Sequence, residues 1–170
     1  MKRALLIAVG LALASTLVVA PAPSYDPWAW LLWGREIAGG TLSTAEGPAF
    51  KPLPVAVCAL LSPLGDAAPW LWVALVRCAA AIGAVLAFEL ARDLARGSRL
   101  AGVLAAAGVL LCGALPAMTA AGADPALVIA LALGAVAAWR SGRTGLALAL
   151  GAACGLVRVE TWPFLAVAGA

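Results

Sequence analysis

A polar segment near the N-terminus holds the side chains best suited to chemistry. It carries the carboxylate of Asp26 and, further along, the ammonium of Lys51, and it includes the closely spaced tryptophans Trp28, Trp30 and Trp33. Apolar stretches precede and follow the segment, so both charges are expected next to a membrane surface. A carboxylate partly shielded from bulk water is a better general base, and a lone ammonium at headgroup level suits a phosphate.

Each of these two residues also has a simpler explanation. Asp26 directly precedes Pro27, which is a good start signal for an amphipathic helix over residues 27–38, so its carboxylate is also explained as a helix N-cap. Lys51 is also explained as a snorkelling residue whose stem lies along apolar surface. One aspartate can do both jobs, and both interpretations stay open.

Arg77 lies inside an apolar stretch, about 12 Å below its outer end at helical rise. An ionisable residue at that depth is a functional-site hypothesis by default. We expect its partner to be Asp124, Glu160 or a substrate phosphate, and a purely structural ion pair is the alternative.

Asp124 and Arg158 stand next to the ends of other apolar stretches. Asp124 precedes Pro125 and is also a plain helix start. Singly, each residue is explained as a cap or a snorkelling side chain, but all are predicted on one membrane face. That convergence makes them candidate site residues.

The composition predicts an integral membrane protein. The 170 residues are 65% hydrophobic and 11% charged, with mean hydropathy +1.05, whereas about a quarter of a soluble domain is charged. No basic run suggests nucleic-acid binding. Histidine is absent, which excludes Ser-His-Asp and Cys-His catalysis and histidine metal ligands. The four cysteines are far apart and form no C-x-x-C pair, which favours packing over metal binding.

We expect an all-α fold, a polytopic transmembrane bundle of about five spans plus a partial sixth. The expected spans cover residues 4–20, 70–90, 100–115, 125–139 and 144–157, and the sixth starts at 162. Residues 21–54 form the first external loop with its interfacial helix. Residues 52–64 are too short for a span and suit a re-entrant or interfacial segment, and residues 116–124 form an external turn.

The basic residues orient this topology. Seven of the eleven fall on one side, which places the N-terminus in the cytoplasm of a multi-pass protein of the plasma (inner) membrane; they are Lys2, Arg3, Arg92, Arg96, Arg99, Arg140 and Arg143. Six of the seven tryptophans fall near the outer interface, where amphipathic rings prefer to lie. Because the chain stops within the sixth span, residues 1–170 are interpreted as one transmembrane module, the N-terminal part of a larger protein.

The order of these features resembles GT-C glycosyltransferases, in particular the protein-mannosyltransferase and aminoarabinose-transferase group with its related bacterial membrane proteins. A first span is followed by an external Tyr25-Asp26, an interfacial helix and Lys51-Pro52 at the return to the membrane. Other stretches that fit are Leu75-Val76-Arg77, Leu90-Ala91-Arg92-Asp93-Leu94, Ala123-Asp124-Pro125-Ala126-Leu127 and residues 155–164.

The resemblance implies a cell-envelope transferase that uses a polyprenyl-phosphate-linked sugar donor and an acceptor hydroxyl at the external face, among membrane lipids. Asp26 matches the catalytic acidic position and would take the acceptor proton. Lys51 matches the lysine that neutralises the departing lipid phosphate. Asp124 matches a second acidic position, and Arg77 and Arg158 match basic positions that suit the same phosphate.

The first loop departs from the pattern, because no second acid adjoins Asp26. This departure puts metal dependence in doubt: we expect no cofactor, and a divalent metal stays open as an alternative that the sequence does not support. Residues 1–170 alone are expected to be inactive. Two other classes remain: a transporter or permease fragment that uses Arg77 and Asp124 as binding groups, and a non-catalytic membrane scaffold. Against the transporter, the polar residues gather in one outer loop instead of at broken helices near the midplane.

Overall fold

The computed structural model describes residues 2–163, and every regular element in that range is helical. The all-α class predicted from sequence is therefore confirmed for this range. The elements are α1 (Lys2–Val18), α2 (Tyr25–Gly39), α3 (Pro52–Leu61), η1 (Ser62–Leu64), α4 (Ala67–Leu94), α5 (Arg99–Leu111), α6 (Leu115–Ala120), α7 (Pro125–Arg140), α8 (Thr144–Gly155) and η2 (Val159–Thr161). Nearly all of the predicted sixth span, from residue 164 on, lies outside the described residues.

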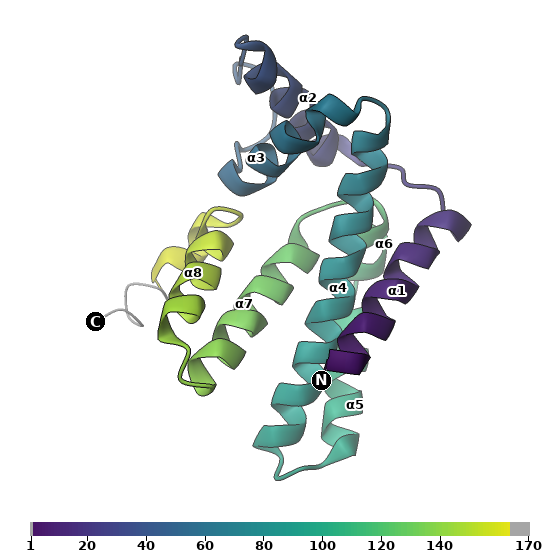
Figure 1. Ribbon diagram of the computed structural model, residues 1–170, viewed down its shortest axis with the longest axis vertical. Coiled ribbons are helices and arrows are strands. Elements are labelled where there is room, and N and C mark those ends of the chain that lie inside the picture. Colours follow the sequence, from purple (N-terminus) through teal and green to yellow (C-terminus); the bar gives the residue numbers. More distant parts are fainter. Residues whose placement is uncertain (1, 164–170) are drawn as a thin grey trace.

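Helix α4 is the centre of the arrangement (Figure 1). It packs against α1, α5 and α7, and α7 packs in turn against α8. The α4–α5 and α7–α8 turns lie at one end of the molecule, and α2 and α3 lie at the other end, as Figure 1 shows. The arginine-rich turns and the first loop are therefore at opposite ends, as the charge pattern predicts.

Local sequence signals set the helix boundaries. Proline occupies the first turn of α3, α6 and α7, where its missing N–H costs no hydrogen bond. The hydroxyl of Ser98 caps α5 by accepting a hydrogen bond from the backbone N–H of Ala101. Helix α2 ends at Gly39 and is capped by Gly40, which adopts a left-handed conformation (φ 72°) and donates its backbone N–H to helical carbonyls.

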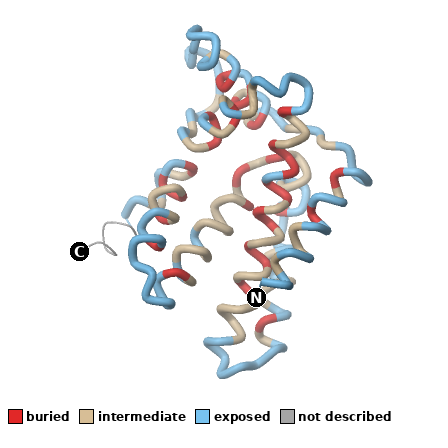
Figure 2. The backbone as a smooth tube through the Cα atoms, in the orientation of Figure 1, coloured by how far each residue is buried: buried red, intermediate tan, exposed pale blue. Residues whose placement is uncertain are grey.

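The apolar core lies where α2, α3, α4 and the start of α7 meet. Trp30 and Trp72 are its largest fully buried side chains, and their rings meet edge to face with centroids 5.7 Å apart. Gly34 permits the close approach of α2 to α3, because a Cβ there would lie 2.6 Å from the backbone of Ala59. Figure 2 shows that buried residues gather in this region and along α4, while the α4–α5 turn is exposed.

Among the described helices, α4 is the one that is long and apolar enough to cross a membrane; it has 28 residues. The other apolar helices are shorter. The stretch predicted as one crossing at residues 100–115 ends as a helix at Leu111, and Gly113, with φ of 46°, lies in the break before α6. Part of the predicted external turn, residues 116–120, is helical in α6.

Candidate functional site

Three charged side chains from distant parts of the chain meet at Asp124. Its carboxylate, which is only 3% exposed, lies 2.9 Å from Nζ of Lys51 through Oδ1 and 2.7 Å from Nε of Arg158 through Oδ2. Nη2 of Arg158 donates a second, longer hydrogen bond of 3.4 Å to Oδ1. Asp124 occupies the N-cap position of α7 but makes no cap hydrogen bond, because its carboxylate is directed to the two cations. We call Lys51, Asp124 and Arg158 the ion cluster.

Two backbone hydrogen bonds and one side-chain bond hold the segments of the ion cluster together. The N–H of Leu53 donates to the carbonyl of Leu156 (3.2 Å), which ties the segment of Lys51 to that of Arg158. The N–H of Ser24 donates to the carbonyl of Ala121 (2.9 Å), and Nε1 of Trp72 donates to the carbonyl of Gly122 (2.8 Å). These bonds fix the α6–α7 loop, which carries Asp124, against α2 and α4.

The conformation of the α6–α7 loop requires glycine at position 122. Its φ of +73° is in the left-handed region, and a Cβ would lie 3.1 Å from the side chain of Val73 and 3.2 Å from that of Trp72. Any other residue would be strained and would push the loop away from α4. The position of Asp124, two residues later, therefore depends on a glycine.

The apolar core contacts the ion cluster through Trp30. Nζ of Lys51 lies 5.1 Å from the ring centroid of Trp30, within cation–π distance. The Lys51 side chain is 14% exposed and that of Arg158 is 40% exposed. A ligand can therefore reach the cluster mainly from the side of Arg158.

Asp26 lies near the ion cluster without joining it. The N-cap interpretation of Asp26 is wrong, because α2 begins at Tyr25 with Ser24 at the N-cap position, and Asp26 lies within the first turn. Its carboxylate is half-buried and makes no hydrogen bond with another described residue. It is close enough to help raise the pKa of Arg158. The bond between Ser24 and Ala121 places the start of α2 beside the loop of Asp124.

The ion cluster stabilises its own charged state. Burial acts to raise the pKa of the Asp124 carboxyl, but hydrogen bonds from Arg158 and Lys51 together outweigh burial, and the pKa lies below its ordinary value of 3.8. The hydrogen bond to Asp124 raises the pKa of Arg158, and the negative charges of Glu160 and Asp26 add to that effect. Asp124 and Arg158 are therefore both ionised at neutral pH.

Arg77 is separate from the cluster. Its Nη1 donates to the carbonyl of Val19 (3.0 Å), just past the end of α1, and to Oγ of Ser15 (3.4 Å). The side chain thus satisfies a carbonyl at the C-terminus of α1. Arg77 forms an ion pair with neither Asp124 nor Glu160, the two protein partners that the sequence suggests.

Sequence reasoning brought Lys51, Asp124 and Arg158 to the same membrane face but missed the groups that position them. Trp72, Gly122 and Ser24 are those groups, and their signal is weak: a glycine two residues before an Asp-Pro pair, and a serine just before Tyr-Asp. Within residues 2–163, no group of three or more His, Cys, Asp or Glu side chains is placed to hold a metal ion.

The arrangement offers two cations and a buried carboxylate at a partly exposed surface, with a second carboxylate beside it. Lys51 and Arg158 carry donors beyond those that contact Asp124, so an anionic group such as a phosphate can bind to them. Asp26 can accept a proton next to that anion. Comparison of the chain with protein-family models, curated proteins and solved structures finds no match in any of the three.

Proposed function

We propose that this protein is a membrane glycosyltransferase that transfers a sugar from a polyprenyl-phosphate-linked donor to an acceptor hydroxyl at the external membrane face. The observation that carries the proposal is the meeting of Lys51, Asp124 and Arg158, with Asp26 beside them, at the end of the molecule opposite the arginine-rich turns. The resemblance to GT-C enzymes assigns a role to each of these four residues.

A membrane setting is supported by the surface of the bundle. Large apolar side chains are exposed along two of its helices, more than a water-soluble monomer normally shows; they include Leu6, Ile7, Leu11, Leu17 and Val18 of α1 and Leu100, Val103, Leu104, Leu110 and Leu111 of α5. We propose α1, α4, α5, α7 and α8 as the spans. The shortest, α8, has 12 residues and a length of about 18 Å at helical rise, so its crossing requires local thinning of the bilayer.

Lys51 and Arg158 are assigned to the donor phosphate. Their two positive charges exceed the one negative charge of Asp124, so the cluster has a net positive charge that attracts an anion. Preorganised cations stabilise the negative charge that grows on the leaving phosphate. Asp124 holds both cations in place and neutralises one of them when no ligand is bound.

Asp26 is assigned as the general base. The acceptor oxygen attacks the anomeric carbon of the sugar, the bond from that carbon to the phosphate oxygen breaks, and the polyprenyl phosphate leaves with the bonding electron pair. The acceptor proton passes to the Asp26 carboxylate. Divalent metal plays no part in this assignment.

A structural role is the competing explanation for the same cluster, since both carboxylate oxygens of Asp124 already have partners. In that case the charges only hold the first loop, the α6–α7 loop and the end of α8 together, as in a scaffold. The two explanations differ at Lys51. A donor contact makes Lys51 important for donor affinity, and a structural tie makes it important for stability alone.

The deciding experiment measures sugar transfer in membranes containing the protein expressed from its native reading frame, with polyprenyl-phosphate sugars as donors. We expect Lys51→Ala to raise the donor KM about 10–100-fold, the equivalent of one hydrogen bond to a charged group. Arg35→Ala, which removes an exposed cation of α2, is the matched control and should leave KM unchanged.

Two results would contradict the proposal. One is an unchanged donor KM in Lys51→Ala. The other is the absence of transfer with every polyprenyl-phosphate sugar while the protein moves a solute across the bilayer, which would establish the transporter alternative.

A further inference from the structure

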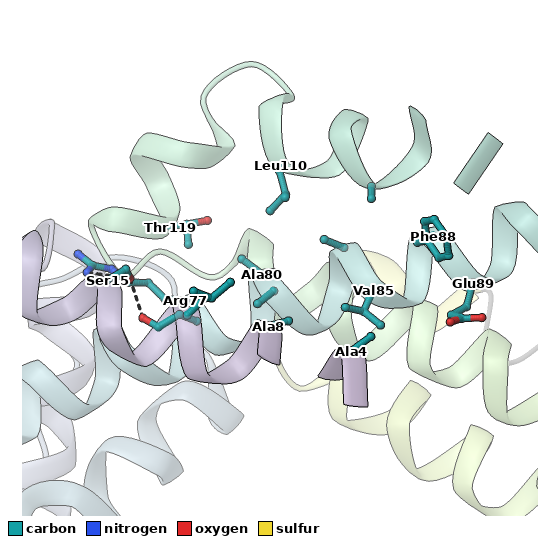
Figure 3. A pocket seen from close by; sticks show the side chains of 15 residues that line it. Ala4, Ala8, Ser15, Arg77, Ala80, Val85, Phe88, Glu89, Leu110 and Thr119 are labelled. Atoms are coloured by element: carbon teal, nitrogen blue, oxygen red, sulfur yellow. Dashed lines mark hydrogen bonds between the residues drawn. The ribbon is translucent and has the colours of Figure 1, made fainter. Parts of the chain in front are cut away.

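A groove of about 660 Å³ runs between α1, α4, α5 and α6, apart from the ion cluster. Its walls are alanine, leucine, valine and phenylalanine side chains, and its polar lining residues are Ser15, Arg77, Glu89 and Thr119. Figure 3 shows Ser15, Arg77 and Thr119 at one end of the groove and Phe88 and Glu89 at the other. The groove is thus an apolar channel with the cation of Arg77 at one end and the carboxylate of Glu89, which pairs with Arg92, at the other.

The cationic end has unused hydrogen-bond donors. Arg77 is 7% exposed, and its buried Nη2 has no hydrogen-bond partner among the described residues. The buried hydroxyl of Thr119 likewise has none within that part of the chain. Buried polar groups normally find a partner. Two unsatisfied groups at one end of one groove therefore indicate a missing acceptor that bears negative charge.

The missing acceptor lies near the end of α1, which the proposed topology places at the level of the outer leaflet headgroups. Nη1 of Arg77 bonds to the carbonyl of Val19, one residue past the end of α1. The guanidinium therefore reaches back toward the outer end of α1, as a snorkelling arginine does. The alanines at positions 80, 81, 84 and 106 leave open space below it.

We propose that this groove binds an anionic glycerophospholipid, with one acyl chain in the apolar channel and the phosphate on Nη2 of Arg77 and the hydroxyl of Thr119. An anionic headgroup is favoured because Arg77 pairs with neutral oxygens of Ser15 and Val19, so its charge is uncompensated there. The site is distinct from the donor site. Helix α1 contributes to the groove and packs on α4, whereas the segments of the ion cluster pack around α2, α3, α7 and α8.

The test uses the whole protein, purified in neutral detergent and freed of lipid, with phosphatidylglycerol and phosphatidylcholine of identical acyl chains as probes. Native mass spectrometry reports the affinity for the first bound lipid. We expect phosphatidylglycerol to bind at least about tenfold more tightly than phosphatidylcholine, the effect of one charge-assisted hydrogen bond. Arg77→Gln should remove that preference, and Arg143→Gln, at an exposed arginine of the α7–α8 turn, should keep it.

Two further variants keep Arg77 and test the proposal if Arg77→Gln does not fold. Thr119→Val removes the second donor at nearly constant volume and should weaken phosphatidylglycerol binding several-fold. Ala106→Leu fills the channel and should weaken both lipids. Equal affinity for the two lipids in the wild type would overturn the proposal. So would an unchanged affinity for phosphatidylglycerol in both Thr119→Val and Ala106→Leu.

Discussion

Arg158 and Arg77 have hydrogen-bond partners of different charge. Arg158 meets the buried carboxylate of Asp124, which Lys51 also contacts. Arg77 is more deeply buried, and its hydrogen-bond partners in the described part of the chain are the carbonyl of Val19 and the hydroxyl of Ser15. Within residues 2–163, a carboxylate compensates the charge of Arg158 and none compensates that of Arg77. Uncompensated charge in apolar surroundings is costly, so each site implies a different kind of ligand.

This difference in charge compensation separates a site that holds segments of the chain together from a site that we propose binds a ligand. In the ion cluster, opposite charges fix three segments of the chain and leave a small positive excess, which the proposed function assigns to a ligand phosphate. At Arg77 the protein provides the cation and the channel, and the negative charge has to come from outside. Stability should therefore depend strongly on Asp124 and weakly on Arg77.

The largest expected effect on stability follows from Asp124→Asn. The change removes the charge that compensates Lys51 and Arg158 and leaves the two cations facing each other. We expect a loss of about 3 kcal/mol in the free energy of unfolding, the lower end for breaking a buried ion pair because Arg158 is 40% exposed. Unfolding by SDS in mixed micelles measures it. Asp66→Asn, at the exposed N-cap of α4, is the control, and an equal small loss in both variants would show that the cluster does not hold the loops.

A smaller effect is expected from Arg77→Met, which replaces the guanidinium with an apolar side chain of similar length. Among the residues that the structure describes, Arg77 has no carboxylate partner and its Nη2 has no hydrogen-bond partner, so the change should alter the free energy of unfolding by less than about 1 kcal/mol. The same micelle titration, on protein freed of lipid, gives the value. A loss as large as that of Asp124→Asn would remove the contrast between the two sites.

The smallest effect concerns pH. The folded-state pKa of Asp124 lies below its ordinary value of 3.8, so this carboxyl stabilises the fold at every pH above that value, and the stabilisation is lost as the pH falls through the folded-state pKa. The raised pKa of Arg158 keeps its charge throughout. We expect the cluster to contribute the same stability from pH 8 to pH 5. The contribution should fall only below about pH 4, and comparison with Asp124→Asn over the same range isolates it.

Sequence reasoning succeeded where one signal was enough. Composition and apolar stretches predicted the helical class, and Asp124-Pro125 marked a helix start that the structure confirms. It failed at Asp26, because Ser24 precedes Tyr25 as the actual N-cap and the proline signal pointed two residues too late. It also could not choose a partner for Arg77 or Asp124. Those partners depend on how α1, α3 and η2 pack. Side-chain pairing between residues so far apart in the sequence leaves no periodic pattern in it.

The central claim is that Asp26 acts as the base in a sugar transfer whose leaving phosphate binds at the ion cluster. Its most direct test is kcat at saturating donor and acceptor for Asp26→Asn, per folded protein, with Glu46→Gln of the exposed first loop as the control. We predict that Asp26→Asn lowers kcat by about 10²–10⁴-fold, as expected for loss of a general base, with the donor KM and the stability nearly unchanged. A kcat equal to that of the wild type would contradict the claim.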